Sequence, residues 1–234
     1  MSKKTIVILS GAGMSAESGL GTFRDSGGLW DKHKIEDVAT PEAWLKDPKR
    51  VTEFYNIRRK QCFEAKPNDG HFALAELEKH YNVIIVTQNI DNLHERAGSS
   101  NVIHLHGEID KVKSSGPNGE SKYYDQKSWK VKIGDKCPEG YQLRPHVVWF
   151  GEAVPMLEKG AEAVEKADIF VVVGTSLNVY PAAGLIDYAP TQADKYLIDP
   201  NRVSVSESFS VLSEYATEGL KIFKEKMIHK KTPN

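Results

Sequence analysis

The sequence predicts an α/β fold, a doubly wound parallel Rossmann-like sheet that carries a small inserted subdomain. Short, nearly continuous apolar runs recur along the 234 residues, as in strands buried on both faces of a parallel sheet. Helical patterns lie between most of these runs, and this alternation is typical of doubly wound folds. Two polar segments interrupt the alternation, which indicates the insertion. The length suits one domain.

The elements follow from these patterns in chain order. The expected strands are residues 5–9, 83–86, 102–105, 146–149, 169–173 and 196–198. The expected helices are residues 48–65, 70–80, 158–167 and 214–227. Residues 25–65 carry no strand signal, and residues 111–143 are rich in Lys, Ser, Gly and Tyr. We expect these two segments to form a small subdomain within a single domain of residues 1–234.

The composition excludes several functional classes. The 31 basic residues nearly balance the 32 acidic ones, so no global charge favours nucleic acid. No apolar stretch approaches the ~18–20 residues that span a bilayer, so no membrane partner is expected. Two cysteines exclude a disulfide-rich scaffold and suit a reducing cytoplasm. We expect a cytoplasmic monomer.

A glycine-rich turn follows the first strand. Gly11, Ala12 and Gly13 begin a match to G-x-G-x-x-G/A, which lets backbone N–H groups approach a pyrophosphate. The same glycines would also suit an ordinary left-handed turn. A dehydrogenase fits poorly, because its second strand should end in an acidic residue about 20 residues past the glycines. Here the next clear strand begins only at residue 83.

Five strings in a fixed order are more specific than the glycine turn. They are GAGMSAESGLGTFRD at residues 11–25, TQNID at 87–91, LHG at 105–107, VWFGE at 148–152 and GTSL at 174–177. They are distributed between residues 11 and 177 of the chain. With these strings the sequence resembles the sirtuins, which are NAD-dependent protein lysine deacylases.

The resemblance implies that NAD is bound and consumed as a co-substrate. The implied NAD-binding residues are Gly11, Ala12, Gly13, Ser15, Glu17, Thr22, Phe23, Arg24, Gln88, Asn89, Asp91, Gly174, Thr175, Ser176, Asp199 and Ala216. Read as structure alone, Asn89 or Asp91 would cap the following helix, and residues 174–176 would form a turn with a helix cap. The family usually has Asn near residues 197–199, where this chain reads Leu-Ile-Asp, so the register of the contacts to the adenosine ribose stays open.

Two histidines compete for the catalytic position. His104 and His106 flank Leu105, so on a continuing strand they share one face, and alternation does not choose between them. His106 stands at the strand end and matches the family's catalytic histidine, with Asn89 beside it in the implied site. An imidazole is suited to accept a proton at neutral pH. In the implied reaction, the acyl oxygen attacks the nicotinamide ribose and His106 acts as general base on a ribose hydroxyl. That hydroxyl attacks the alkylimidate intermediate, and water resolves it, so the products are nicotinamide, free lysine and O-acyl-ADP-ribose.

The acyl-lysine protein substrate has its own implied contacts. Val148, Phe150 and Gly151 resemble the segment that pairs with the substrate backbone. Tyr55 and Arg58 share a helix face at spacing i, i+3 and resemble the sirtuin class that removes succinyl and malonyl groups. Arg offers a planar fork for a carboxylate. The alternative is an ordinary amphipathic helix in a plain deacetylase.

Most sirtuins carry a zinc site made by four cysteines, which this chain cannot form. Ser114 and Ser115 stand where the first pair is expected, and only Cys137 remains of the second. Neutral hydroxyls do not replace thiolates for tetrahedral zinc. A site from Cys137, His146 and carboxylates has no supporting spacing. We expect no zinc.

Two further functions remain open. The same activated ribose could be transferred to another acceptor, which would make the chain a mono-ADP-ribosyltransferase. The chain could also be a catalytically silent sensor of NAD or ADP-ribose, although the residues His106, Asn89 and Asp91 argue for turnover.

Overall fold

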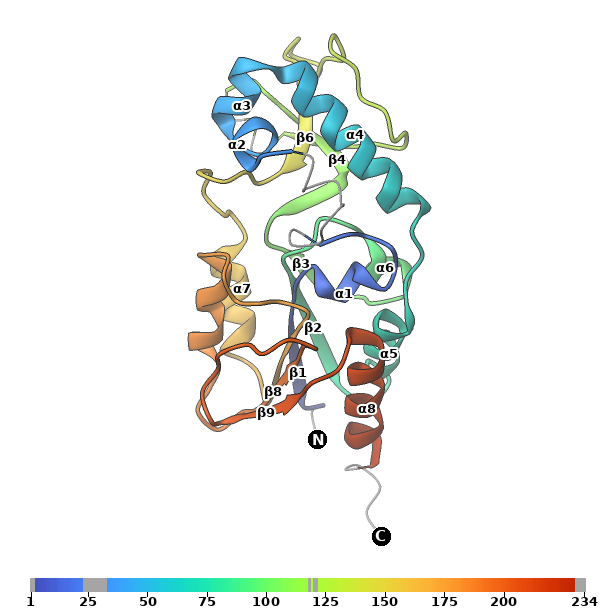
Figure 1. Ribbon diagram of the computed structural model, residues 1–234, viewed down its shortest axis with the longest axis vertical. Coiled ribbons are helices and arrows are strands. Elements are labelled where there is room, and N and C mark those ends of the chain that lie inside the picture. The colour runs from blue at the N-terminus through green and yellow to red at the C-terminus, as the bar shows by residue number, and fades with distance from the viewer. Residues whose placement is uncertain (1–2, 23–32, 118, 120–121, 230–234) are drawn as a thin grey trace.

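The computed structural model describes residues 3–22, 33–117, 119 and 122–229. Its strands form two separate sheets, a parallel one with six strands and an antiparallel one with three. Figure 1 shows the large sheet with its helices in the lower part of the molecule and the small sheet above it, beside α2, α3 and α4. No helix of the described residues is long and apolar enough to cross a bilayer.

The large sheet has the strand order β3-β2-β1-β7-β8-β9, and all its pairings are parallel. Its strands are β1 (Thr5–Ser10), β2 (Asn82–Thr87), β3 (Val102–His104), β7 (Ile169–Val173), β8 (Asp194–Ile198) and β9 (Phe209–Leu212). The strand order reverses between β1 and β7, and ligands of open α/β sheets bind at such a point. Ser10 pairs in register with Thr87 on one side and Val173 on the other, so these three strands end together.

Both faces of the large sheet are covered by helices because its strands alternate between two apolar faces. Ile6 and Ile8 point to the face covered by α5 (Asp69–Leu77) and α8 (Ala216–His229). Val7 and Leu9 point to the opposite face, which is covered by α7 (Leu157–Val164) and the 3₁₀ helix η2 (Ala182–Tyr188). The β1 strand is therefore buried on both faces and both edges.

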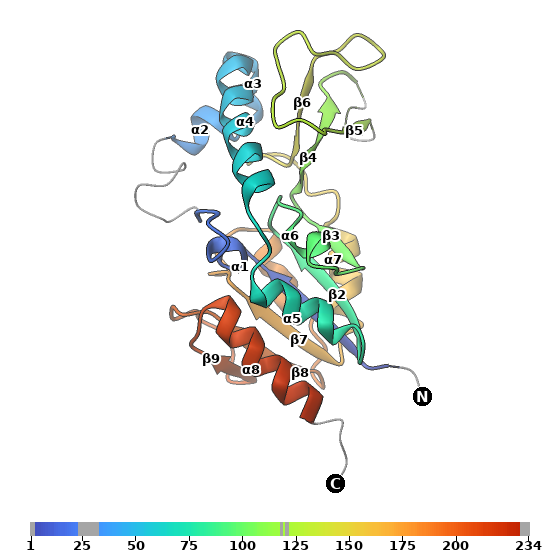
Figure 2. The same ribbon diagram turned by 90° about the vertical axis from the view of Figure 1, so that its right-hand side faces the viewer.

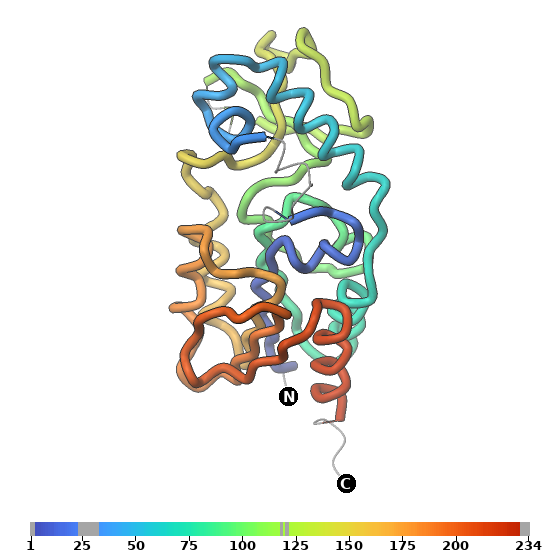
Figure 3. The backbone as a smooth tube through the Cα atoms, viewed as in Figure 1, coloured from blue at the N-terminus to red at the C-terminus, as the bar shows by residue number. Residues whose placement is uncertain are grey.

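The connection from β1 to β2 is long and leaves the sheet. Figure 3 shows the chain passing through the upper part of the molecule before it returns to α5. The connection contains α1 (Gly13–Ala16), α2 (Ile35–Val38), α3 (Pro41–Lys46), α4 (Pro48–Glu64) and α5. The start of α4 is well defined, because Pro48 is its first residue and the Asp47 carboxylate accepts the Arg50 N–H at 2.9 Å.

The small sheet has the order β5-β4-β6 and is antiparallel. Its strands are β4 (Gly107–Ser114), β5 (Tyr123–Asp125) and β6 (Leu143–Val147). The short helix α6 (Leu93–Arg96) precedes β3 in the chain. Figure 2 shows α4 beside β4 and β6, and a third apolar core, which includes Phe54, Tyr55 and Trp149, joins this helix to the sheet.

The Rossmann-like α/β fold with its smaller second sheet confirms the predicted fold class. The prediction of residues 146–149 as a strand of the parallel sheet is wrong. His146 and Val147 end the antiparallel strand β6, and the next N–H groups leave the ladder. Val148 donates to the His106 carbonyl at 2.9 Å, and Trp149 donates to the Glu152 carboxylate at 2.8 Å. The small sheet also extends to Gly107 and Val147, beyond the predicted segment 111–143.

Candidate active site

Two backbone loops meet where β1 and β7 end. The N–H of Gly11 donates to the Val173 carbonyl at 3.0 Å, and that of Gly13 donates to the Gly174 carbonyl at 2.8 Å. A Cβ on Gly11 would lie 2.6 Å from the Thr175 Cβ, and one on Gly13 would lie 2.7 Å from the Gly174 Cα. The glycines are therefore required by close approach of the loops, in addition to any ligand.

A buried polar cluster lies beside this glycine turn. The Asn89 amide donates to the Gly11 carbonyl at 3.0 Å and to the Ser15 hydroxyl at 3.1 Å. The Ser15 hydroxyl donates in turn to the Asp91 carboxylate at 3.0 Å. Burial raises the pKa of Asp91, although its hydrogen bonds oppose this effect. The Asp91 carboxylate also accepts the Leu93 N–H at 3.2 Å, so Asp91 supports the start of α6 as well.

Gln88 links the ends of β2 and β7. Its side-chain amide donates to the Thr175 hydroxyl at 3.2 Å, and its carbonyl contacts His106 Nδ1 at 3.0 Å. Thr175 is buried, whereas Ser176 is partly exposed. The structure therefore brings together the predicted residues of the strings at 11–15, 88–91 and 174–176.

Of the two ring nitrogens of His106, Nδ1 is hydrogen-bonded within the structure, and Nε2 has no hydrogen-bond partner among the described residues. Because the Gln88 carbonyl can only accept, Nδ1 of His106 carries the proton and Nε2 keeps its lone pair. Nε2 makes no hydrogen bond to any described residue, and the side chain is partly exposed. Burial lowers the pKa of His106 below its usual value, so the ring is neutral at pH 7. A neutral imidazole with a free Nε2 can accept a proton from a bound group.

His104 is held differently. Its Nδ1 donates to the Asn89 carbonyl at 2.9 Å, and its Nε2 lies 2.8 Å from the Glu95 carboxylate. Burial disfavours the charged ring, but the hydrogen bond and charge of Glu95 outweigh this effect and raise the pKa of His104. Both nitrogens are occupied, so His104 is a structural residue. The choice between the two histidines, which alternation left open, is made by their partners.

The remaining predicted NAD residues lie around this cluster at different depths. Asp199 follows β8 at the same sheet edge; it is buried, and its carboxylate accepts the Asn201 N–H at 2.9 Å. Ala216 is the buried first residue of α8. Glu17 is exposed and accepts from both the N–H and the hydroxyl of Thr217, at 2.9 and 2.6 Å, so it ties α1 to α8. Ala12 and Thr22 are partly exposed, and Phe23 and Arg24 lie outside the described residues.

Tyr55 is part of the third core. It is 2% exposed, and its ring centroid lies 6.4 Å from that of Trp149. The Arg144 guanidinium stacks 3.4 Å from the centroid of the same Trp149 ring and forms an ion pair with Glu152 at 2.8 Å. Burial raises the pKa of Tyr55, so its hydroxyl is a neutral donor at pH 7.

Arg58 is the charged residue on the same face of α4. It is partly exposed and forms no hydrogen bond or ion pair with any residue that the structure describes. Burial raises the pKa of Tyr55 and of Asp91, and the positive charge of Arg58 acts against this by lowering the pKa of both groups. A half-buried guanidinium without an anion is a natural position for a carboxylate from outside the chain.

In residues 148–151, which are predicted to bind the substrate backbone, two N–H groups already donate to carbonyls of this chain. The Val148 N–H donates to the His106 carbonyl at 2.9 Å, and the Phe150 N–H donates to the Ala39 carbonyl at 3.0 Å. Gly151 is exposed at φ +91°, and the Phe150 ring is 42% exposed. These bonds place the segment between His106 and the helices α2 and α3, and leave its outer face open.

A polar contact lies where the family resemblance places the zinc cysteines that this chain lacks. The Ser114 hydroxyl lies 3.3 Å from the Cys137 sulfur, which also lies 3.3 Å from the Glu139 carboxylate. Ser115 is exposed. Across the described ranges, no group of three or more His, Cys, Asp or Glu side chains is placed to hold a metal ion.

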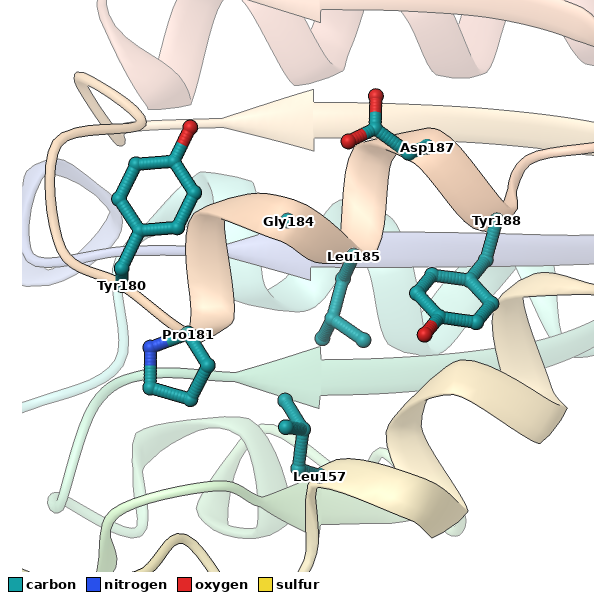
Figure 4. Close-up of a pocket in the computed structure, with 7 residues that line it drawn as sticks. All are labelled: Leu157, Tyr180, Pro181, Gly184, Leu185, Asp187 and Tyr188. Carbon is teal, nitrogen blue, oxygen red and sulfur yellow. The ribbon is translucent and has the colours of Figure 1, made fainter.

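A separate cavity of about 460 Å³ lies between η2 and the start of α7 (Figure 4). Its lining consists of Leu157, Tyr180, Pro181, Gly184, Leu185, Asp187 and Tyr188. No predicted site residue lines it. The lining has one carboxylate and two tyrosine hydroxyls but no histidine, so it differs from the cluster at the sheet edge.

Sequence reasoning missed the polar residues beneath the site. Ser10, Thr87 and His94 are fully buried and hydrogen-bonded to one another, with Ser10 Oγ 2.8 Å from Thr87 Oγ1 and 3.2 Å from His94 Nε2. The available signal was a polar residue that ends each of two adjacent apolar strands. It also missed Arg144, and it assigned no role to Glu152 of the string at 148–152; both residues hold Trp149.

Comparison with known proteins agrees with this geometry. A model of the Sir2 family matches residues 11–181. An NAD-dependent protein deacylase of Bacteroides thetaiotaomicron is 57% identical over 230 residues, which are 96% of this chain and 98% of that protein. One of Helicobacter pylori is 49% identical over 228 residues, again 96% and 98% of the two chains.

Solved structures resemble the whole chain. A Sir2 homologue in complex with NAD is 38% identical, with a TM-score of 0.88 over 98% of this chain and 91% of that one. A mutant Sir2 homologue in complex with ADP-ribose is also 38% identical, with a TM-score of 0.89 over 99% and 96%. The ordered motifs, the polar cluster at the sheet edge and these likenesses lead to one conclusion: the chain belongs to the Sir2 family.

Proposed function

We propose that this NAD-dependent protein deacylase removes succinyl and malonyl groups from lysine side chains in preference to acetyl. The observation that carries the preference is Arg58, a partly exposed guanidinium without a partner among the described residues, on the α4 face it shares with Tyr55. The proposed partners are acyl-lysine proteins, and we expect a monomer in a reducing cytoplasm without a nucleic-acid or membrane partner.

The residues at the sheet edge fit NAD. Gly11 and Gly13 bring bare backbone to the ends of β1 and β7, where a pyrophosphate can approach closely. Asn89, Ser15 and Asp91 form a buried set of amide, hydroxyl and carboxylate groups that suits ribose hydroxyls and a carboxamide. NAD supplies a ribose carbon that becomes electrophilic as nicotinamide leaves.

We assign the general-base role to His106. Its Nδ1–H is held by the Gln88 carbonyl, which fixes the tautomer and leaves Nε2 as the acceptor. Because burial lowers the pKa of His106, the ring is in the base form at neutral pH. Asn89 follows Gln88 in the chain, and its side-chain amide is held by the Gly11 carbonyl and the Ser15 hydroxyl.

The acyl preference follows from charge. A succinyl or malonyl carboxylate would give Arg58 an anionic partner, and the buried Tyr55 hydroxyl is a neutral donor on the same helix face. A hydrogen bond to a charged group contributes about 1.5–3 kcal/mol. That free energy corresponds to a roughly ten- to hundredfold preference over acetyl.

The test is kcat/KM on one peptide that carries acetyl-, malonyl- or succinyl-lysine, with NAD. We expect succinyl and malonyl to exceed acetyl by about tenfold or more in the wild type, and the ratio to approach one in Arg58→Met. Arg50→Met is the matched control, because Arg50 lies on the same helix but already pairs with Asp37 at 3.0 Å. Its ratio should equal that of the wild type.

The other outcomes identify the alternatives. If acetyl is the best substrate and Arg58→Met changes nothing, the protein is a plain deacetylase and Arg58 belongs to a solvated helix face. If ADP-ribose is found on protein instead of O-acyl-ADP-ribose, the chain is a mono-ADP-ribosyltransferase. If NAD binds but the wild type turns over no faster than His106→Ala, the chain is a sensor.

A further inference from the structure

A row of buried polar groups runs beneath the site, with a gap in its hydrogen bonds between two histidines. His71 on α5, His94 on α6, Ser10 at the end of β1 and Thr87 at the end of β2 are each 0% exposed. Buried polar groups are costly unless they are hydrogen-bonded. The bonds that this row makes therefore define how its members are oriented.

The first bond sets the tautomer of His71. The Asn68 backbone N–H donates to His71 Nδ1 at 3.2 Å, so Nδ1 carries no proton and the neutral ring has its proton on Nε2. Burial lowers the pKa of His71 to about 4, which keeps the ring neutral at pH 7.

The second set of bonds determines the tautomer of His94. The Ser10 hydroxyl donates its only proton to Thr87 Oγ1 at 2.8 Å, so toward His94 it can only accept. His94 Nε2 lies 3.2 Å from this oxygen and is therefore the donor, which leaves a bare lone pair on Nδ1.

The two rings then complement each other. Their centroids are 4.8 Å apart at an interplanar angle of 59°. His71 Nε2 and His94 Nδ1 are both buried without a hydrogen-bond partner among the described residues. In these tautomers, His71 Nε2–H is a donor without an acceptor, and His94 Nδ1 is an acceptor without a donor. All donors of the row therefore point the same way, from Asn68 toward Thr87.

The row ends on one peptide group of the site. Thr87 Oγ1 accepts the Asn89 N–H at 3.1 Å. That N–H belongs to the same planar unit as the Gln88 carbonyl. The Gln88 carbonyl is the group that accepts His106 Nδ1–H at 3.0 Å. Rotation of this plane would break the bond that fixes the tautomer of His106.

We propose that His94 is a positioning residue for the reaction: through Ser10 and Thr87 it orients the Gln88–Asn89 peptide plane, and that plane holds His106 with Nε2 free to accept a proton. This proposal rests on the general-base role of His106 in the proposed function. Among the described residues, the side chain of His94 contacts Ser10 and His71, neither of which is predicted to bind the substrate.

The kinetic test compares His94→Leu, His94→Gln and Ser10→Ala with the wild type, on whichever acyl peptide the wild type turns over fastest. We expect kcat to fall about tenfold or more in His94→Leu, with KM for the peptide unchanged, because a misoriented base affects the chemical step. His94→Gln restores an N–H near the Nε2 position and should recover most of the loss. In the double variant of His94→Leu and Ser10→Ala the losses should not add, because both break one row.

A second readout needs no turnover. With ¹⁵N-labelled histidine, the ring nitrogens of His106 report its tautomer directly, and a His106→Asn spectrum assigns them. We expect the Nδ1–H form in the wild type and a mixture of both tautomers in His94→Leu and Ser10→Ala. His80→Leu, at an exposed position, is the control and should change neither readout.

The outcomes separate the two proposals. If the wild type deacylates no peptide but His106 still changes tautomer with His94, the proposed function fails and the positioning survives. If kcat and the His106 tautomer are unchanged in His94→Leu and Ser10→Ala, the positioning role is overturned. If His94→Leu does not fold, Ser10→Ala, which deletes a single oxygen, decides the question alone.

Discussion

At the scale of single residues, the partners of a side chain decide its role more than its type does. His104 and His106 lie two positions apart at the end of β3, and both contact a backbone carbonyl of the 88–89 segment. Glu95 occupies the second nitrogen of His104, whereas nothing described occupies that of His106. Only one of the two rings can therefore exchange a proton with a bound substrate.

The pH dependence of the reaction tests this difference. Burial lowers the pKa of His106, so the neutral base persists as the pH falls through 6.5. We expect kcat/KM to stay level down to that pH and to decline only below it, as the ring takes up a proton. Initial rates between about pH 5 and 8 measure this profile.

The control for this profile is His106→Gln, which should lose about 10²- to 10⁴-fold in kcat/KM, the usual contribution of a positioned base. The residual kcat/KM of this variant should not show the decline at acidic pH. If kcat/KM of this variant still declined at acidic pH, a group other than His106 would be responsible for the decline.

The sequence predicted the residues of the site better than it predicted what holds them. Ordered motifs identified Asn89, Asp91 and His106, because polar groups after buried strands gather at one sheet edge. The supporting bonds were invisible: Ser10 and His94 are 84 positions apart, and nothing local in the sequence couples them. Tautomers in particular depend on which partner faces each nitrogen, and that is a property of the folded chain.

At the scale of elements, the site depends on the close contact of the loops that follow β1 and β7. Gly174 has φ +61°, and a Cβ there would lie 2.4 Å from the Met14 nitrogen. Gly174→Ala should therefore separate the two loops and weaken NAD binding by about tenfold or more, beyond the cost of the left-handed backbone itself. Titration calorimetry with NAD measures the effect.

Gly140→Ala is the matched control. Gly140 has a similar φ of +86°, but a Cβ there would meet no atom within 4 Å. This variant bears the same kind of backbone cost without the clash, so its NAD affinity should equal that of the wild type. Equal affinity in both variants would contradict the close-contact account.

The small sheet makes a second prediction at this scale. Cys137 is the only thiol there, and its neighbours Ser114 and Glu139 do not complete a tetrahedral thiolate site. We expect the purified protein to contain less than one zinc per chain by mass spectrometry of the metal. Chelation should leave the unfolding temperature unchanged. Stoichiometric zinc, or a chelator-induced drop in Tm, would contradict this.

At the scale of the whole molecule, acid should weaken the fold through its buried histidines. The pKa of His71 is about 4 in the folded chain, because of burial, against 6.5 when exposed. The unfolded chain therefore binds more protons between these values. Stability that is fully present above pH 6.5 is lost as the pH falls toward 4, by up to about 3 kcal/mol from this residue.

Urea unfolding at several pH values measures this loss. His71→Gln should show a shallower decline in unfolding free energy over the same interval, because it has nothing to protonate. His80→Gln changes an exposed position and should follow the wild type. Parallel curves for the wild type and His71→Gln would exclude His71 as a cause of acid sensitivity.

The same scale shows how far the sequence predicted the fold. The central strands were identified because they are apolar on both faces. The edge strand β9 was missed because its residues Phe209–Leu212 are partly or fully exposed. The small sheet was missed because its sequence is polar: Lys113 and Ser114 are buried there by their surroundings and have no apolar pattern. Apolar patterning predicts a core, and it says little about strands whose burial comes from distant segments.

The place of β1 in the sheet has a consequence for synthesis. It is made before the elements that cover it: one edge pairs with β2, the other pairs with β7 at Ile169–Val173, and one face is covered by α8 at Ala216–His229. A nascent chain still on the ribosome before β7 emerges therefore holds β1, which is buried in the native sheet, with an open edge. Such edges recruit other strands. The native sheet can close only after β7, β8 and β9 have been made.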